Sequence, residues 1–152
     1  PRMTSPTPVI SLRAITADTV CTICKLQVLA AQEVFVASNA VSIAQAYFEP
    51  KAWFRAIHAD EIPVGFVMLS LDPALPEYYI WRFMIDTSYQ HLGYGTKALR
   101  LVIDHIRTLP RAREILVSCV PADGSPEPFY RKAGFIPTGQ VMDGEVVLKL
   151  ML

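Results

Sequence analysis

Two glycines in the middle of the chain mark the segment with the clearest chemical potential. Residues 90–95 read Gln-His-Leu-Gly-Tyr-Gly, between a mostly apolar run at residues 79–85 and a helical pattern that begins near Gly93. The first amides of a helix have no partner within the helix, and the helix dipole adds partial positive charge at that end. Glycine lets a phosphate approach this backbone because no Cβ stands in the way. The segment therefore predicts a phosphate-binding site, although an ordinary glycine turn would use the same residues.

The spacing of these glycines does not fit two common nucleotide motifs. Ala98 stands three residues after Gly95, so the dinucleotide fingerprint is incomplete, and the Gly-Lys-Ser/Thr ending of the P-loop is missing. The segment has the form Gln/Arg-x-x-Gly-x-Gly/Ala, and a second motif, Phe-Tyr-Arg-Lys-Ala-Gly-Phe, follows at residues 129–135. Together the two motifs resemble the acetyl-coenzyme A (acetyl-CoA) site of the GNAT superfamily of N-acetyltransferases. The resemblance implies an enzyme that uses acetyl-CoA as its cosubstrate.

The resemblance also implies which residues hold acetyl-CoA. In that family the strand before the glycine turn bonds the pantetheine arm through its backbone, at positions that correspond here to Phe83 and Ile85. The pyrophosphate would lie on the backbone of a cradle formed by Gln90, His91, Leu92, Gly93, Tyr94, Gly95 and Thr96. Gln90 replaces a frequent arginine and so removes a positive charge. Lys97 and Arg100 either supply that charge or belong to a solvated helix face.

Tyr130 corresponds to the tyrosine that in many family members donates a proton to the leaving thiolate of CoA. An aromatic residue on an amphipathic helix can also be core, but the neighbouring Phe129 could fill that apolar role. Cys119 is a candidate covalent nucleophile near the cofactor, with a structural thiol as the alternative. Asp123 replaces an asparagine, and Pro126 an alanine, that are common in the family, so the local cofactor contacts are expected to differ here.

The sequence does not identify the general base. Some relatives carry a glutamate on the strand before the glycine turn, and the corresponding residue here is Tyr79. Strict alternation would place the odd-numbered residues from Tyr79 to Ile85 on one face of the strand, with Arg82 and Asp86 on the other. Because no carboxylate shares the face of Tyr79, the amine is expected to lose its proton through ordered water.

Three further segments, residues 35–39, 81–86 and 124–130, resemble bacterial spermine/spermidine acetyltransferases. That resemblance implies a small-molecule amine or a polyamine as the acetyl acceptor. Carboxylates such as Glu33, Asp143 or Glu145 would bind it, with Tyr79 in the same site, although a carboxylate in such a loop is more often a surface charge. Two other functions stay open: acetyl transfer to a protein N-terminus or lysine, and a catalytically weak acyl-CoA-binding regulatory domain.

Composition narrows the class of protein. The chain has 152 residues, of which 52% are hydrophobic and 18% charged, with 14 basic and 14 acidic side chains. These values predict a single domain at residues 9–152 behind a disordered leader at residues 1–8. The balanced charge gives no support for a nucleic-acid or membrane partner, and no metal site is expected. The cysteines, two of them in Cys21-Thr-Ile-Cys24, are expected to be buried apolar thiols in a reducing cytoplasm. The apolar composition is compatible with a homodimer.

The apolar pattern predicts an α+β fold with a mixed, mostly antiparallel sheet of about seven strands and about four helices, which matches the GNAT fold. The expected strands cover residues 9–15, 51–59, 62–71, 77–86, 114–120, 135–141 and 145–150. The expected helices cover residues 18–28, 40–48, 93–108 and 126–133, with Asp18 capping the first and Ser38 or Asn39 the second. The crossover helix makes strands 77–86 and 114–120 a parallel pair. In the GNAT fold a splay between them, here around residues 84 and 118, forms the acetyl-CoA slot.

Overall fold

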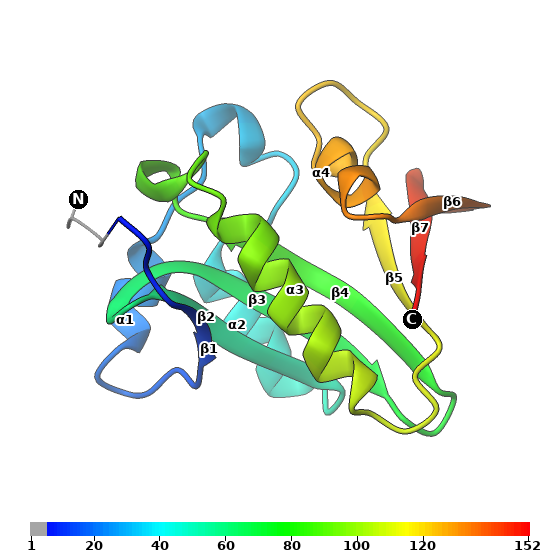
Figure 1. Cartoon of the computed structure of the whole chain (residues 1–152), viewed down its shortest axis with the longest axis horizontal. Coiled ribbons are helices and arrows are strands. Elements are labelled where there is room, and N and C mark those ends of the chain that lie inside the picture. Colours follow the sequence, from blue (N-terminus) through cyan, green and yellow to red (C-terminus); the bar gives the residue numbers. More distant parts are fainter. Residues whose placement is uncertain (1–5) are drawn as a thin grey trace.

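A seven-stranded sheet in the order β1-β2-β3-β4-β5-β7-β6 runs through the structure, a computed structural model that describes residues 6–152 (Figure 1). The strands are β1 (Ile10–Arg13), β2 (Ala52–Ala59), β3 (Ile62–Asp72), β4 (Glu77–Ile85), β5 (Glu114–Cys119), β6 (Ile136–Met142) and β7 (Glu145–Met151). Within the described chain every neighbouring pair is antiparallel except β4 and β5, which confirms the predicted mixed sheet. The leader prediction for residues 1–8 falls largely outside the described residues, and Pro8 is buried.

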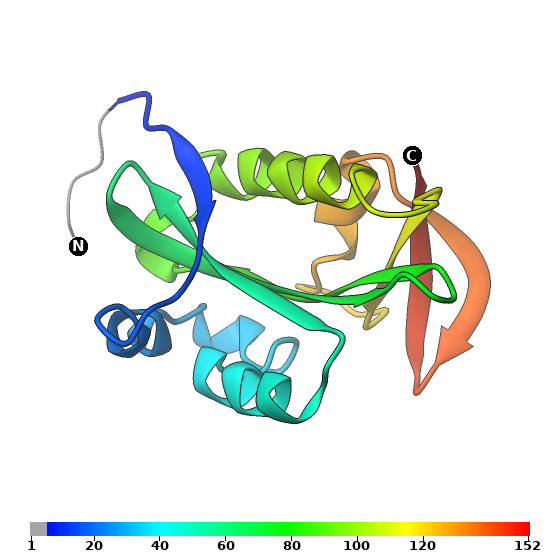
Figure 2. The same cartoon turned by 90° about the horizontal axis from the view of Figure 1, so that it is seen from below.

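Helices cover both faces of this sheet. They are α1 (Val20–Lys25), α2 (Asn39–Phe48), α3 (Tyr94–Arg107) and α4 (Glu127–Lys132), with short 3-10 helices η1 (Ala30–Gln32) and η2 (Thr87–Tyr89). α3 and α4 lie on one face, and α1 and α2 on the other (Figure 2). α3 forms because Ala98, Leu99, Val102 and Ile106 share one stripe of the helix, and all four are buried against the sheet.

A β-bulge interrupts the pairing of β4 with β3. Met68 of β3 lies opposite Arg82, whereas the next residue, Leu69, lies opposite Ile80. Trp81 is therefore an extra residue in β4 with no partner in β3.

The bulge changes which side chains share a face. Ile80, Phe83 and Ile85 pack in the core on the α3 side, whereas Trp81 and Met84 pack in the cluster under α1 and α2. The predicted strict alternation along residues 79–85 is therefore wrong, because one inserted residue moves every later side chain to the opposite face.

β4 and β5 pair over a short length and then separate. Only Tyr79 with Leu116 and Ile80 with Val117 are in register, and the two strands diverge beyond them (Figure 1). β5 stays paired with β7 along its whole length, from Glu114 to Cys119. The predicted splay is confirmed, and it opens toward the N-terminal end of α3.

The first helix is shorter than predicted. Asp18 does not cap it, because Thr19 occupies the N-cap position. The chain leaves the helix before residue 28 because the backbone of Gln27 binds the loop after β4. The Gln27 N–H donates to Asp86 Oδ1 at 2.8 Å, and the Gln27 carbonyl accepts from the Thr87 N–H at 2.7 Å. Tertiary hydrogen bonds thus replace the last helical turn.

The other local predictions agree more closely with the structure. Ser38 caps α2, and its hydroxyl accepts from the Val41 N–H at 3.2 Å. The β6–β7 turn uses Asp143 and Gly144, both with positive φ, as the dipeptide predicted. β1 is shorter than the predicted residues 9–15, because it pairs only with the last four residues of β2.

Candidate active site between the splayed strands

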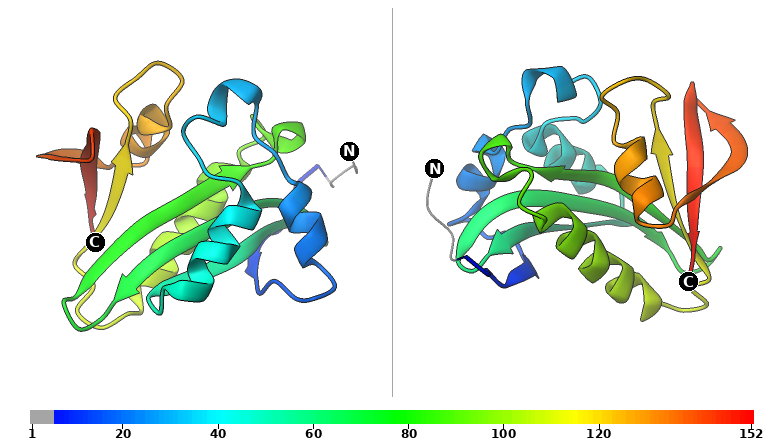
Figure 3. Two further views of the ribbon diagram at one scale, coloured as in Figure 1. Left: turned by 180° about the vertical axis from the view of Figure 1, so that it is seen from behind. Right: turned by 45° about the horizontal axis from the view of Figure 1, so that its top comes forward.

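The splay between β4 and β5 opens into a cleft of about 1500 Å³. Its lining comes from β4, the end of β5, residues 89–96, the loop before α2, α4 and the β6–β7 turn. Figure 3 shows the η1 loop and the loop after β5 at the same end of the sheet. The predicted site residues that line the cleft are Glu33, Tyr79, Phe83, Ile85, Gln90, His91, Gly93, Tyr94, Gly95, Thr96 and Tyr130. Leu92 does not line it, and its side chain is 55% exposed.

The backbone of β4 presents an edge to this cleft. The Asp86 N–H donates to the Val64 carbonyl at 2.7 Å, so alternate residues, Met84 and Asp86, bond to β3. The backbone groups of Phe83 and Ile85 therefore face the opposite side, where β5 has already diverged. Within the described chain this edge has no paired strand, which leaves it available to an extended ligand arm.

The start of α3 has the backbone geometry of an anion cradle. His91 and Gly93 are both left-handed, with φ of 64° and 83°, and Gly93 is the N-cap of the helix. The N–H groups of the first turn are consequently directed away from the helix, toward the cleft that residues 93–96 line. A Cβ placed on Gly95 would lie 3.4 Å from Phe129 and 3.6 Å from Ile85, both ordinary contact distances, so the start of α3 lies close to these two side chains.

The positions of Lys97 and Arg100 favour the second of their two predicted roles, a solvated helix face. Lys97 and Arg100 are exposed and do not line the cleft. Lys132 of α4 does line it, one helical turn after Phe129, whereas Arg131 is paired with Glu127 at 2.7 Å. Sequence reasoning missed Lys132, although its spacing of three residues from Phe129 puts both on one face of α4.

The sheet divides the cleft into two halves. Phe83, Ile85, Phe129 and Tyr130 belong to the core on the α3 side, next to the cradle. On the other side the Tyr79 hydroxyl contacts Met142 Sδ at 3.9 Å, which joins β4 to the end of β6. A ligand arm entering from the cradle would thus meet, at the splay, a second ligand entering from the α2 side.

Tyr130 is both a core residue and a wall of the cleft. Only 4% of its surface is exposed, and its ring packs edge-on against Phe129 and Phe135 with centroids 5.2 and 5.4 Å apart. Phe129 also packs against the core, as expected, but it is less buried than Tyr130. Burial, together with the nearby Cys119 thiol, raises the pKa of Tyr130 well above its usual range. Its hydroxyl therefore stays protonated at neutral pH and can donate a hydrogen bond.

Cys119 does not have the properties of a nucleophile. Burial raises the pKa of its thiol to about 12, and the charges of Glu127 and Glu145 act in the same direction. The reactive thiolate form is therefore rare at neutral pH, which favours the structural alternative. The expectation of buried thiols is wrong for Cys21, which is exposed, while Cys24 is half-buried.

The cleft carries more acidic than basic side chains. Four carboxylates line it, Glu33, Glu49, Asp143 and Glu145, against Lys51, Arg82 and Lys132. The Lys51 ammonium is paired with Asp72 at 3.0 Å. The predicted carboxylates thus lie at the cleft, and Glu49 is an addition that sequence reasoning missed.

Arg82 and Tyr79 are further polar residues that line the cleft. Arg82 donates to the Trp81 carbonyl at 3.1 Å and to Gln45 Oε1 at 3.0 Å, while its buried Nε has no partner in the described chain. Burial lowers the pKa of Arg82 and raises that of Tyr79. Tyr79 therefore remains protonated at neutral pH and cannot serve as the base in place of the glutamate of some relatives.

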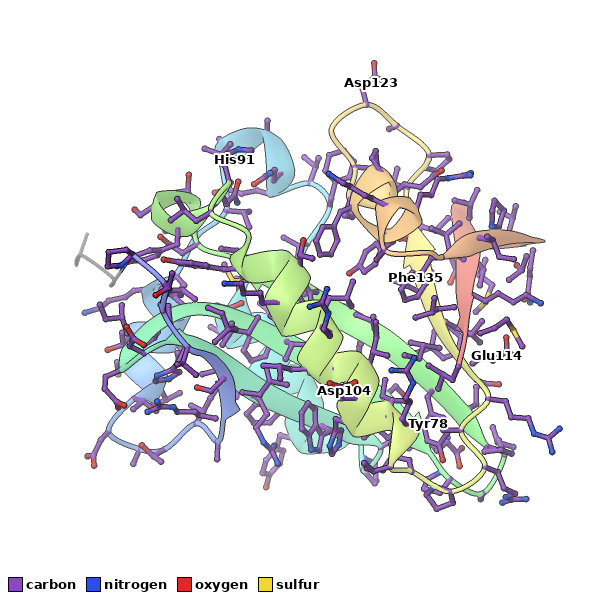
Figure 4. All side chains as sticks on the ribbon, in the orientation of Figure 1. Tyr78, His91, Asp104, Glu114, Asp123 and Phe135 are labelled. Carbon is purple, nitrogen blue, oxygen red and sulfur yellow. The ribbon has the colours of Figure 1, made fainter. Side chains whose placement is uncertain are left out.

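Asp123 and Pro126, the two residues that depart from those common in the family, lie in the loop after β5. Asp123 projects outward from the tip of this loop (Figure 4) and does not line the cleft. The start of α4 is held instead by Ser125, whose hydroxyl accepts from the Glu127 N–H at 3.1 Å. The side chain at position 123, where the family commonly has asparagine, therefore does not line the cleft.

Residues 6–152 contain no cluster of three metal-ligating side chains. No helix in the same part of the chain is long and apolar enough to cross a membrane.

Comparison with known proteins gives concordant results. The model of the acetyltransferase (GNAT) family matches residues 24–135, more than half of the chain. The spermine/spermidine N(1)-acetyltransferase of Bacillus subtilis (strain 168) is 28% identical over 150 residues, covering 91% of this chain and 96% of the relative.

Solved structures share the fold at lower identity. The PaiA N-acetyltransferase from Thermoplasma acidophilum, in complex with coenzyme A, is 13% identical with a TM-score of 0.71, covering 95% of this chain and 99% of that one. Naa50 from Arabidopsis thaliana, in complex with the bisubstrate analogue CoA-Ac-MVNAL, is 18% identical with a TM-score of 0.68, covering 94% of this chain and 99% of that one.

Proposed function

The chain belongs to the acetyltransferase (GNAT) family and is an acetyl-CoA-dependent N-acetyltransferase, and from that premise we propose that its acceptor is a small primary amine, foremost a polyamine such as spermidine or spermine. One observation carries the choice of acceptor: four carboxylates, Glu33, Glu49, Asp143 and Glu145, line the cleft. A polyamine carries several ammonium groups at neutral pH, and carboxylates are their natural partners. The Bacillus relative, named for spermine and spermidine, supports the same class.

The cofactor half fits acetyl-CoA through this chain's own residues. The cradle at residues 90–96 would hold the pyrophosphate on backbone N–H groups, and the open β4 edge at Phe83 and Ile85 would bond the pantetheine arm. Lys132, which lines the same cleft, would supply the positive charge that Gln90 lacks. The thioester would then lie at the splay, near Tyr130.

The reaction proceeds by direct attack of the amine on the thioester carbon. An alkyl amine of pKa about 10.4 must first lose its proton, at a cost of about 4–5 kcal/mol at pH 7. The neutral nitrogen then forms the new C–N bond, and a backbone N–H of the β4 edge stabilises the oxyanion. The C–S bond breaks, and the departing sulfur accepts a hydrogen bond from Tyr130. The bound nitrogen, which is positively charged after the attack, loses its second proton to solvent, and solvent returns a proton to the thiolate, so that the products are the neutral amide and free CoA.

A peptide or amino-acid acceptor is the second candidate, and Arg82 favours it. A half-buried guanidinium with an unpartnered Nε suits the carboxylate or carbonyl of such an acceptor better than an ammonium group.

The two candidates are separated by a thiol-release assay. Acetyl-CoA is supplied with a panel of spermidine, spermine, single amino acids, an aminoglycoside and peptides with free N-termini. We expect kcat/KM for the polyamines to exceed that for every peptide and amino acid. A higher kcat/KM for a peptide or an amino acid would contradict the polyamine proposal and support the second candidate acceptor. Absence of turnover with every amine would favour the acyl-CoA-binding regulatory function.

A further inference from the structure

Two segments far apart in the sequence are joined by a pair of glutamine side chains. Gln90, in the cradle, donates from Nε2 to Oε1 of Gln32 in η1 at 2.9 Å. Gln32 Nε2 lies 3.5 Å from Gln90 Oε1, so the two amides face each other. Gln32 is immediately followed by Glu33, the carboxylate on the acceptor side of the cleft.

The amide of Gln90 is fully occupied by these contacts. Its Nε2 also donates to the carbonyl of Ile85 at 3.0 Å, so both N–H bonds of the amide are used. Gln32 Oε1 in turn accepts from the Leu29 N–H at 3.1 Å, which fixes the turn of η1. The Gln90 side chain therefore has no N–H left for a phosphate, and its role differs from that of a cofactor ligand.

The same two segments are held together at a second point. Asp86 Oδ1 accepts from the Gln27 N–H at 2.8 Å, and its Oδ2 accepts from the Ser88 N–H at 3.0 Å. The Thr87 N–H donates back to the Gln27 carbonyl. Residues 26–37, here called the acceptor loop, are thus bonded at two points to residues 86–96, here called the cradle segment: once at Asp86 and once at Gln90 of the cradle itself.

We propose that the Gln32–Gln90 amide pair is a clasp that couples the acetyl-CoA cradle to the acceptor loop, so that cofactor binding orders Glu33 and its neighbours for the amine. Gln32 and Gln90 are then positioning residues. The proposal rests on the proposed function for the identity of the two ligands.

The physical basis is a shared ordering cost. The cradle segment becomes fixed when its backbone binds the pyrophosphate, and the clasp extends that order to Gln32 and the loop around it. An acceptor that binds the ordered loop loses less conformational freedom, which is positive cooperativity without a change of shape. By linkage the acceptor must strengthen cofactor binding by the same factor. A half-buried pair of amide hydrogen bonds sets this factor at about three- to tenfold.

The first test is amide hydrogen exchange in residues 26–37, with and without CoA as the probe. In the parent protein CoA should slow exchange of the acceptor loop, including the Leu29 and Phe35 amides that bond within it. Gln32→Ala and Gln90→Ala should each abolish this slowing. Gln27→Ala is the matched control, because its exposed side chain lies outside the clasp while its backbone contacts stay, and it should keep the effect.

Two results would overturn the clasp. One is an acceptor loop whose exchange CoA does not slow in the parent, or slows equally in the clasp variants. The other is a Gln90→Ala variant that binds CoA more than about tenfold more weakly while Gln32→Ala binds normally, which would make Gln90 a direct cofactor ligand. Both measurements need CoA only, so they stand whether or not polyamines prove to be acceptors. If Gln90→Ala does not fold, Gln32→Ala alone decides the exchange result.

A double-mutant cycle then tests the kinetic consequence. Each single variant should raise KM for the acceptor about three- to tenfold, with kcat nearly unchanged, and the double variant should be no worse than either single one. Additive losses would contradict the clasp, because they would mean that the two glutamines act independently.

Discussion

Replacing Gly95 by leucine should abolish acetyl-CoA binding and leave the fold intact. A Cβ at this position lies 3.4 Å from Phe129 and 3.6 Å from Ile85, which are ordinary contact distances, so alanine fits. Because Gly95 lies in the first turn of α3, alanine should stabilise the helix by up to about 1 kcal/mol. The further carbons of leucine extend beyond Cβ into the slot between the two side chains, where the pantetheine arm is expected.

The size of the effect follows from the groups that leucine displaces. Filling the slot removes contacts of about three methylene groups of the arm, at about 0.8 kcal/mol for each. Steric overlap between the leucine side chain and the pantetheine arm adds about 1–3 kcal/mol to the binding penalty. CoA should therefore bind more than about a hundredfold more weakly to Gly95→Leu, while Gly95→Ala stays close to the parent.

The assay is calorimetric titration with CoA beside thermal unfolding of the same samples. Gly93→Ala is the matched control with the opposite effect on stability. Its Cβ would meet open space, but the left-handed φ of 83° makes any side chain there cost about 1–2 kcal/mol. This variant should therefore melt earlier than the parent, unlike Gly95→Ala. A folded Gly95→Leu protein that bound CoA with parental affinity would refute the assignment of the slot.

Three other predictions test the chemistry. Tyr130→Phe should lower kcat about ten- to a hundredfold and leave the melting temperature unchanged, because only a hydrogen bond to the leaving sulfur is lost. A parental kcat, measured where the chemical step is limiting, would mean that Tyr130 has only a structural role in the core. Glu33→Gln should raise KM for spermidine about two- to fivefold without changing KM for acetyl-CoA, since the carboxylate is exposed; an unchanged spermidine KM would remove Glu33 from the site. At pH 8 iodoacetamide should modify Cys21 and spare Cys119, whose pKa of about 12 keeps it protonated; mass spectrometry of the peptides decides, and rapid loss of the Cys119 thiol would contradict its assignment as structural.

Local sequence signals predicted most of the fold correctly because they arise from the residues that form each element. The stripe of Ala98, Leu99, Val102 and Ile106 predicted α3, and Asp143-Gly144 predicted the last hairpin. The parallel pair followed from the crossover helix that separates its strands. Each of these depends on contacts within a short stretch of chain or on a general rule of topology.

The wrong predictions share a different cause, which is a partner far away in the sequence. The bulge at Trp81 comes from the register between β3 and β4, and no pattern within β4 alone reports it. The early end of α1 comes from the hydrogen bonds of Gln27 to the loop after β4. The exposure of Cys21 likewise depends on how the short α1 packs rather than on the Cys-x-x-Cys spacing.

The same reason limits how much of the site could be predicted from the sequence. The two motifs located the cradle and Tyr130, since both are contiguous segments. The roles of Gln90 and Lys132 depend on neighbours from other elements, so they become visible only in the folded chain. The homodimer stays a prediction, as does the path of the amine proton.

The most direct test of the central claim is a single-turnover experiment with spermidine. Excess enzyme is mixed with acetyl-CoA and the polyamine, and the quenched mixture is analysed by mass spectrometry for acetylated spermidine and free CoA. The account predicts equal amounts of the two products, formed with no acetylated protein as an intermediate. Free CoA without acetylated spermidine, or an acetyl group on the protein, would contradict it.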